Sequence, residues 1–213
     1  MIYFKKCDYS AGDDRISHKN ILHEEAHRLL DRALQKKGVR AENKELIYNK
    51  YGKPMLKDND TIHFNISHCR RLAVCALTEN AIGVDAENIR EYPKRVLNRC
   101  FTANEISFVR ENEFPDRAFF QIWTLKESYA KAIGTGITFP LKEAEFIIGN
   151  NFIAANTERK FAFSQIIIDN EFVCSVCCDD ILNNKVLFRS YEEFIPLDLS
   201  LIHISEPTRL RRI

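Results

Sequence analysis

The sequence has little of what marks membrane, secreted or fibrous proteins. Glycine and proline are scarce, at 7 and 6 of 213 residues, and no apolar run reaches the ~18 residues of a membrane-spanning helix. The first residues, Met1 to Lys6, hold no signal-peptide apolar region. The net charge is only +1, which argues against a general nucleic-acid coat. We expect a soluble, cytoplasmic globular protein that binds neither nucleic acid nor membrane.

Cysteine usage excludes a secreted disulfide framework. The seven cysteines are odd in number and irregularly spaced, at positions 7, 69, 75, 100, 174, 177 and 178. The cluster of Cys174, Cys177 and Cys178 could suggest zinc, but no second C-x-x-C or H-x-x-x-H supplies the remaining ligands of a structural site. Because residues 171–178 also have the composition of a strand, we interpret these cysteines as reduced core residues.

The chain alternates helical and strand patterns, which predicts an α+β fold. We expect helices at 20–37, 94–100, 103–112 and 117–133, and strands at 2–7, 61–66, 72–78, 81–87, 143–148, 151–155, 161–168, 171–178 and 185–191. Residues 72–77 (LAVCAL) resemble residues 172–177 (FVCSVC). This sequence similarity fits two related α+β halves, residues 1–80 and 81–198. Residues 199–213 read as a non-native tail, and the alternative is a genuine basic tail.

Two carboxylates follow one another on an expected strand, Gly83-Val84-Asp85-Ala86-Glu87. Residues i and i+2 of a strand point to the same face, so Asp85 and Glu87 should lie side by side. Their mutual repulsion would be relieved by a hard divalent cation such as Mg²⁺. A solvated strand edge is the alternative for an isolated D-x-E.

The clearest helix, residues 117–133, carries a second group. Trp123, Glu127 and Lys131 are spaced by four residues and share a helix face. An aromatic beside a charged pair indicates a partly buried site, although Glu127 and Lys131 could also form an ordinary surface ion pair. Gly134 and Gly136 should end the helix.

Two turns carry polar residues. We expect a strand to end in a turn that offers Ser67 and His68, which could contact an anion. Gly52 and Pro54 fix another tight turn with Lys53 at its tip, and its spacing does not match a Walker-A loop. Both could be plain turns without chemistry. Together with the three acids, these residues suit a Mg²⁺-bound phosphate or diphosphate better than acyl transfer.

The order of the motifs resembles the 4′-phosphopantetheinyl transferase superfamily, in its monomeric surfactin-synthetase-activating type. The resemblance covers roughly residues 20–180 and rests on Gly-Lys-Pro, Phe-Asn-Ile-Ser-His, Gly-Val-Asp-x-Glu and Trp-x-x-Lys-Glu-Ser-x-x-Lys-Ala-x-Gly-x-Gly. It also takes in residues 25–30 (EAHRLL) and 101–105 (FTANE). It implies two similar α+β halves about a pseudo-twofold axis, with the active site in the cleft between them.

The resemblance also implies roles for individual residues. By analogy, three acids bind Mg²⁺, namely Asp85, Glu87 and Glu127. The coenzyme A site would be lined by Gly52, Lys53, Pro54, Ser67 and His68, with Arg28 as a further phosphate contact. Glu127, or a metal-bound water, would accept the proton of the attacking serine, and Lys131 would stabilise the leaving phosphate.

The implied reaction transfers the 4′-phosphopantetheine arm of coenzyme A to a serine of an acyl or peptidyl carrier protein and releases adenosine 3′,5′-bisphosphate. Two positions depart from the family pattern: Ala86 replaces a larger aliphatic residue, and Cys69 replaces a serine. We expect a packing change from Ala86, and weaker coenzyme A binding if the replaced serine contacts a phosphate. The alternatives are another Mg²⁺-dependent enzyme, such as a diphosphate hydrolase, a non-catalytic binding protein, or a structural domain.

Overall fold

The computed structural model describes residues 2–7, 15–40, 44–150 and 152–179. The predicted strand at 185–191 and the tail at 199–213 therefore lie outside the described residues. The first part of the chain forms β1 (Ile2–Lys6), α1 (Arg15–Lys36), β2 (Leu46–Tyr48), β3 (Pro54–Leu56), β4 (His63–Cys69) and β5 (Leu72–Thr78).

The second part repeats this order with three helices in place of one. It forms β6 (Ile82–Asn88), α2 (Lys94–Cys100), α3 (Ala103–Glu111), α4 (Pro115–Ile133), the 3₁₀ turns η2 (Gly136–Thr138) and η3 (Leu141–Glu143), β7 (Glu145–Ile148), β8 (Ile153–Asn156), β9 (Ala162–Ile168) and β10 (Phe172–Cys178).

The two parts share one topology, strand by strand. The antiparallel sheets have the orders β1-β5-β4 and β6-β10-β9. Even a single turn contact recurs: the Cys7 amide donates to the Arg71 carbonyl at 2.7 Å, and the Ile89 amide donates to the Glu171 carbonyl at 2.7 Å. The strands that resemble each other in sequence, β5 and β10, are the central strands of their sheets. The α+β class and the two similar halves are confirmed. We keep the division at residue 80 as a proposal.

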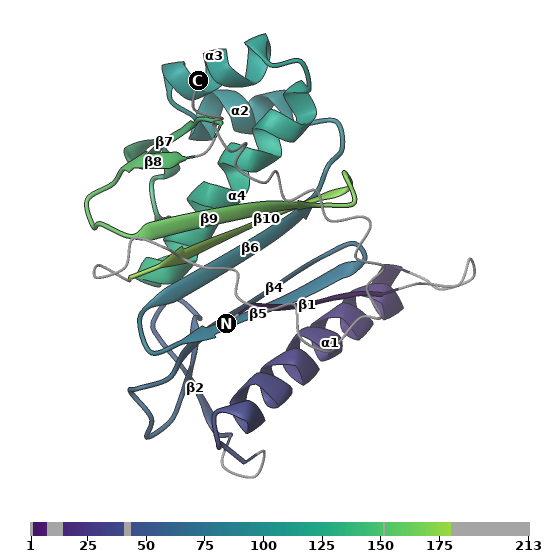
Figure 1. Ribbon diagram of the computed structural model, residues 1–213, viewed down its shortest axis with the longest axis vertical. Helices are drawn as coiled ribbons and strands as arrows, with labels where there is room; N and C mark the ends of the chain where they lie inside the picture. Colours follow the sequence, from purple (N-terminus) through teal and green to yellow (C-terminus); the bar gives the residue numbers. More distant parts are fainter. Residues whose placement is uncertain (1, 8–14, 41–43, 151, 180–213) are drawn as a thin grey trace, which may run out of the picture.

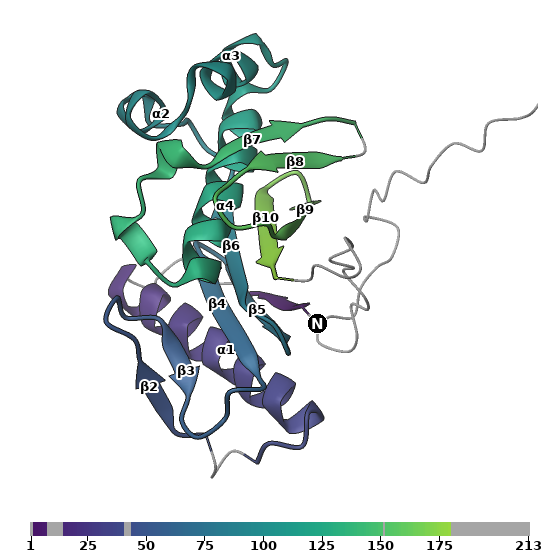
Figure 2. The ribbon, with the colours of Figure 1, turned by 90° about the vertical axis from the view of Figure 1, so that its left-hand side faces the viewer.

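The elements stack in four layers, in the order α1, first sheet, second sheet, α4 (Figure 1). Side chains of α1 pack on the first sheet, and an apolar cluster from β4, β5, β6 and β10 fills the space between the sheets. A third cluster joins α4 to α2, α3, β7 and β10. Figure 2 shows β4 and β6 adjacent in the middle of the stack, with α1 and α4 on either side. The edges of the two sheets therefore meet at β4 and β6.

Local sequence signals account for the ends of the helices. Helix α3 begins with a complete capping box between Thr102 and Glu105, as predicted. Helix α4 has Pro115 in its first turn and ends at Gly134, whose φ of 77° is the left-handed conformation that glycine tolerates. All seven residues of β10 are buried, and all seven cysteines of the chain are free thiols. The interpretation of C-x-x-C-C as core cysteines is confirmed.

One local prediction was wrong, and two short strands were missed. Strand β4 continues to Cys69 instead of ending in a turn at Ser67 and His68, because its partner β5 pairs with every residue as far as Cys69. The predicted turn before Pro54 is present, and it joins two short strands that were missed, β2 and β3, into a hairpin. No helix in the described ranges combines the length and apolarity needed to cross a membrane.

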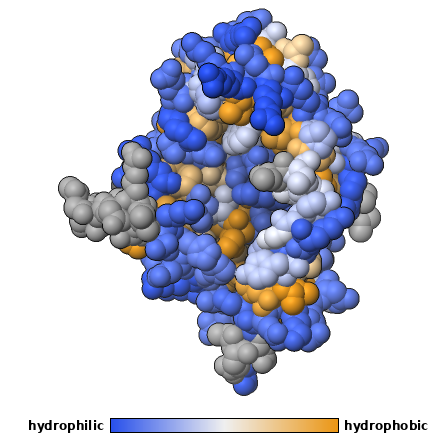
Figure 3. Space-filling view, turned by 180° about the vertical axis from the view of Figure 1, so that it is seen from behind, coloured by the Kyte–Doolittle hydropathy of each residue, from blue (hydrophilic) through white to orange (hydrophobic). Residues whose placement is uncertain are grey.

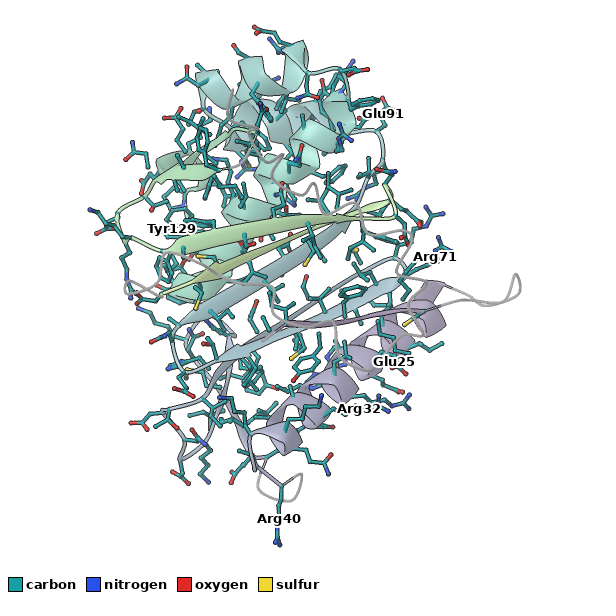
Figure 4. The ribbon with its side chains drawn as sticks, in the orientation of Figure 1. Glu25, Arg32, Arg40, Arg71, Glu91 and Tyr129 are labelled. Atoms are coloured by element: carbon teal, nitrogen blue, oxygen red, sulfur yellow. The ribbon has the colours of Figure 1, made fainter. Side chains whose placement is uncertain are left out.

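An ion pair joins the equivalent turns of the two halves. The guanidinium Nη2 of Arg71, in the β4–β5 turn, donates to both carboxylate oxygens of Glu171, in the β9–β10 turn, at 2.7 Å each. Figure 4 labels Arg71 at this end of the strands, beyond the end of α1. Arg71 and Glu171 occupy equivalent positions in the two halves. If the halves were identical in sequence, these two positions would carry the same charge and repel, whereas here they carry opposite charges and attract.

Candidate functional site

Helix α4 lies directly against β6 because Gly83 has no side chain. A Cβ built on Gly83 would lie 2.0 Å from the Ser128 carbonyl oxygen and 2.5 Å from the Ala132 nitrogen, both in α4. Strand alternation places Asp85 and Glu87 on the same face as Gly83, toward the helix. The close approach of backbone to backbone therefore sets how near the carboxylates of β6 come to the side chains of α4.

Asp85 is the centre of this group. It is buried, and its Oδ1 accepts hydrogen bonds from the Lys131 ammonium at 2.7 Å and the Ser67 hydroxyl at 3.1 Å. Lys131 also donates to the Ser67 oxygen and to the Val84 carbonyl, each at 3.1 Å. The other oxygen, Asp85 Oδ2, is buried and has no hydrogen-bond partner within the described part of the chain. An orphaned carboxylate oxygen of this kind needs a cation or a donor from outside.

Glu127 and Glu87 surround Asp85 with further negative charge. Burial raises the pKa of Glu127 to about 7; the nearby carboxylates of Asp85 and Glu87 add to the rise, and Lys131 opposes it. Burial also raises the pKa of Glu87, even though Arg90 donates to its carboxylate at 2.8 Å. The three predicted acids are thus brought together, from strand and helix, into one electrostatically coupled group. Lys131 pairs with Asp85 and not with Glu127.

The donor chemistry of this group fits a hard divalent cation. All three acids offer oxygen ligands, which Mg²⁺ prefers, and Asp85 Oδ2 has no hydrogen-bond partner among the described residues. Across the described residues, however, no three His, Cys, Asp or Glu side chains are already arranged to hold a metal ion. The Lys131 ammonium is the cation closest to Asp85 here, so metal binding would require the carboxylates to turn toward a common point.

The side chains of β4 connect the first sheet to this group. The Asn65 amide oxygen accepts from the Val84 amide at 2.8 Å, and the Ser67 hydroxyl accepts from the Ala86 amide at 3.3 Å. The edges of β4 and β6 are therefore joined by side chains. Ser67 also contacts Asp85, so this group of residues lies where the two halves meet, and its role as the active site stays a prediction. Asn65 was missed as a positioning residue, although it stands in the quoted Phe-Asn-Ile-Ser-His motif.

His68 lies on the opposite face of β4 from Ser67. Its ring is 6.2 Å from the His23 ring on α1, which is itself 4.5 Å from the ring of His27. Burial lowers the pKa of His68, and the nearby His23, Lys131 and Lys19 lower it further. The region around His68 is therefore rich in cationic groups, as an anion site requires. His23 and His27 were missed, although their i, i+4 spacing on one helix face was a visible signal.

Lys53 reaches the second half of the molecule. Its ammonium donates to the backbone carbonyls of Ile82 at 3.0 Å and Ala132 at 3.1 Å. Burial lowers its pKa to about 8. Gly52, with φ of 85°, makes the turn that Pro54 follows at the start of β3. Lys53 is thus near the site, but its hydrogen bonds go to backbone, and its predicted contact with coenzyme A phosphates stays a prediction.

Arg28 lies on α1 and is 64% exposed in its side chain. It bonds to Glu25 on the same helix, which also pairs with Lys5 at 2.8 Å. Figure 4 labels Glu25 on the α1 side, away from α4. The structure does not bring Arg28 into the carboxylate group. Trp123 stacks on Phe119 and packs against the core of the second half.

The two positions that depart from the family pattern are both buried. Ala86 packs in the cluster between the sheets, which confirms that it points away from the acids. Cys69 is close enough to Glu87 and Asp85 for their charges to add to the rise that burial causes in its thiol pKa.

The face of the molecule opposite to that of Figure 1 is mostly hydrophilic, with hydrophobic surface in small separate areas (Figure 3).

Comparison with known proteins gives a consistent result. Residues 81–177 match the family model described as the 4′-phosphopantetheinyl transferase superfamily. The chain is 41% identical over 95 residues to the 4′-phosphopantetheinyl transferase gsp of Aneurinibacillus migulanus, covering 44% of this chain and 39% of the relative. It is 34% identical over 148 residues to the 4′-phosphopantetheinyl transferase HetI of a Nostoc species, covering 65% of this chain and 62% of the relative.

The structure also resembles a solved one. Holo-[acyl-carrier-protein] synthase of Thermotoga maritima matches with a TM-score of 0.41 and 19% identity, over 46% of this chain and 62% of that chain. This likeness is too distant to support a shared function. In the first curated relatives that it matches, the chain spans about two fifths of their length.

Proposed function

Because residues 81–177 match the model of the 4′-phosphopantetheinyl transferase superfamily, we propose that the chain is a member and transfers the 4′-phosphopantetheine arm of coenzyme A to a serine of an acyl or peptidyl carrier protein. Adenosine 3′,5′-bisphosphate would be the second product. The observation that carries the proposal is the coupled group of Asp85, Glu87 and Glu127 around Lys131, in which one buried carboxylate oxygen has no partner in the part of the chain that the structure describes.

We propose that Asp85, Glu87 and Glu127 hold Mg²⁺ in the active enzyme. A bound Mg²⁺ would neutralise the pyrophosphate of coenzyme A and orient it for displacement. The support is chemical: three carboxylates that offer oxygen ligands, the mutual repulsion between them, and an Asp85 Oδ2 with no partner from residues 2–7, 15–40, 44–150 or 152–179. Coenzyme A would lie on the side where β4 and β6 meet, near Ser67 and His68.

Glu127 is suited to accept the proton of the incoming serine. In the metal-free chain, burial beside Asp85 and Glu87 raises the pKa of Glu127 to about 7, near the working pH at which a general base is most effective. A bound Mg²⁺ would lower that pKa. The serine oxygen bonds to the phosphorus that carries the pantetheine arm, and its proton passes to Glu127. The bond from that phosphorus to the bridging oxygen breaks, and that oxygen leaves with adenosine 3′,5′-bisphosphate.

Lys131 would stabilise the leaving phosphate. Its ammonium is already fixed between β6 and β4 by hydrogen bonds to Asp85, Ser67 and Val84. The negative charge that grows on the leaving oxygen is of the sign that this ammonium attracts, so the stabilisation increases along the reaction. We further propose a cytoplasmic monomer, since one chain holds both halves and its seven cysteines are free.

Intact-protein mass spectrometry tests the function. An apo carrier protein is incubated with the chain, coenzyme A and Mg²⁺, and a control contains EDTA. A gain of one phosphopantetheine that requires the metal is expected. If the carrier mass is unchanged across acyl and peptidyl carriers while coenzyme A is cleaved, the protein is a hydrolase and the proposal fails.

A further inference from the structure

The loop before β3 is held in one conformation by Asn49. Its side-chain oxygen accepts from the amides of Tyr51 and Lys53, both at 2.9 Å. The backbone amide of Asn49 donates to the Lys53 carbonyl at 3.0 Å, and the backbone amide of Gly52 donates to the Asn49 carbonyl at 2.9 Å. Four hydrogen bonds in five residues fix the direction in which the Lys53 side chain leaves the loop.

The same loop caps the end of α4. The Asn49 side-chain amide donates to the Gly134 carbonyl at 2.9 Å, and the Lys53 ammonium donates to the Ala132 carbonyl at 3.1 Å. The last carbonyls of a helix lack partners within it and carry partial negative charge. A cation and an amide from the other half of the molecule therefore satisfy the end of the helix that carries Glu127 and Lys131.

Lys53 also bonds to the first residue of β6. Its donation to the Ile82 carbonyl, at 3.0 Å, comes one residue before Gly83, where strand and helix are closest. One ammonium thus joins β6 and α4 at their point of closest approach. Strand β6 carries Asp85 and Glu87, and helix α4 carries Glu127 and Lys131.

We propose that Lys53 is a positioning residue, which fixes α4 against β6 and thereby sets the spacing of the four charged groups, and that it is not a contact to coenzyme A phosphate. Its two hydrogen bonds to carbonyls orient the ammonium toward the backbone of the second half. A residue of this kind affects turnover and metal binding through geometry, whereas a phosphate contact affects the affinity for coenzyme A.

Lys53→Met tests the proposal, because it keeps the length of the side chain and removes the ammonium. Lys50→Met is the matched control: it removes the same charge from the same loop, and Lys50 is exposed and lies over the ring of Tyr51. Binding of Mn²⁺ to the full chain is measured by electron paramagnetic resonance, and kcat and KM for coenzyme A are measured with an apo carrier.

We expect Lys53→Met to weaken Mn²⁺ binding and lower kcat by about 10-fold or more, while KM for coenzyme A stays within about 2-fold of the wild type. Lys50→Met should match the wild type in all three. A rise in KM with kcat and Mn²⁺ binding unchanged would overturn the proposal, as would wild-type behaviour of Lys53→Met.

Lys53→Arg is the second variant, in case Lys53→Met does not fold. The larger, planar guanidinium cannot reproduce the position of an ammonium between two carbonyls. The positioning role therefore predicts a loss of Mn²⁺ affinity and kcat, whereas a phosphate contact would be kept by this cation. The kinetic part rests on the proposed function. If the wild type transfers nothing, that function fails by itself, and the Mn²⁺ comparison still decides the role of Lys53.

Discussion

Gly83→Ala tests whether backbone contact between β6 and α4 sets the geometry of the site. The new Cβ would lie 2.0 Å from the Ser128 carbonyl oxygen, and ordinary contact begins at 3.4 Å. The helix would have to move by about 1.4 Å, because the opposing atoms are backbone and cannot rotate away. A misplacement of about 1 Å in an active site can cost about 100-fold in rate. We expect a loss of transfer activity of about this size.

The same substitution should lower stability. Overpacking a well-packed contact costs about 1–3 kcal/mol, and for a domain of this size each kcal/mol corresponds to a shift in Tm of about 2–4 °C. Urea unfolding gives the change in free energy, and Mn²⁺ binding reports the site without relying on catalysis. Gly83→Ala should weaken the binding of Mn²⁺ even under conditions where the variant is fully folded.

Gly149→Ala is the matched control. There a new Cβ would lie 2.2 Å from the ring of Phe152, but that side chain is 60% exposed and can turn away. We expect a change in stability of less than about 0.5 kcal/mol, typical of surface substitutions, and unchanged Mn²⁺ binding. Equal effects of the two variants would refute the reasoning, and so would a Gly83→Ala protein with wild-type activity.

Further substitutions test individual charges. Glu127→Gln should abolish transfer. Folding raises the pKa of Glu127 and so favours its protonated form. In EDTA, the free energy of unfolding of the wild type should therefore fall relative to that of this variant as pH rises from 4.5 to about 7. Chemical unfolding at several pH values checks this, and parallel curves would contradict it. Asp85→Asn should weaken Mg²⁺ binding by at least about 10-fold, measured by calorimetry; unchanged affinity would remove Asp85 from the ligand set. Arg71→Glu and Glu171→Arg should each destabilise the fold, and the double reversal should recover about 0.2–1 kcal/mol; additive losses in the double-mutant cycle would show that the pair does not couple the halves.

Much of the fold could be predicted because the signals are local. Periodicity, the Thr102–Glu105 capping box and the glycine at position 134 place the helices within a few residues of their observed ends. The alternation of side chains on a strand correctly puts Asp85 and Glu87 on one face. The hairpin of β2 and β3 was missed because strands of three residues carry too little pattern to stand out from a turn.

The acids of the site were also visible in the sequence, through the spacing of D-x-E and of Glu127 and Lys131 on one helix face. What sequence spacing could not give is the pairing of Lys131 with Asp85, the contact of Ser67 with both, or the separation of Ser67 from His68 onto opposite faces of β4. These depend on which strand edges meet.

By itself, then, the sequence determines the long helices and most of the strands, which side chains share a face, and which chemistry the acids suit, because each of these depends on residues only a few positions apart. Only the tertiary structure decides that Lys53 reaches the backbone of the opposite half, that Arg28 stays on the far helix, and that one Asp85 oxygen has no partner within the described residues. Those outcomes depend on how two sheets and two helices stack, and the local pattern of residues does not encode distances across that stack.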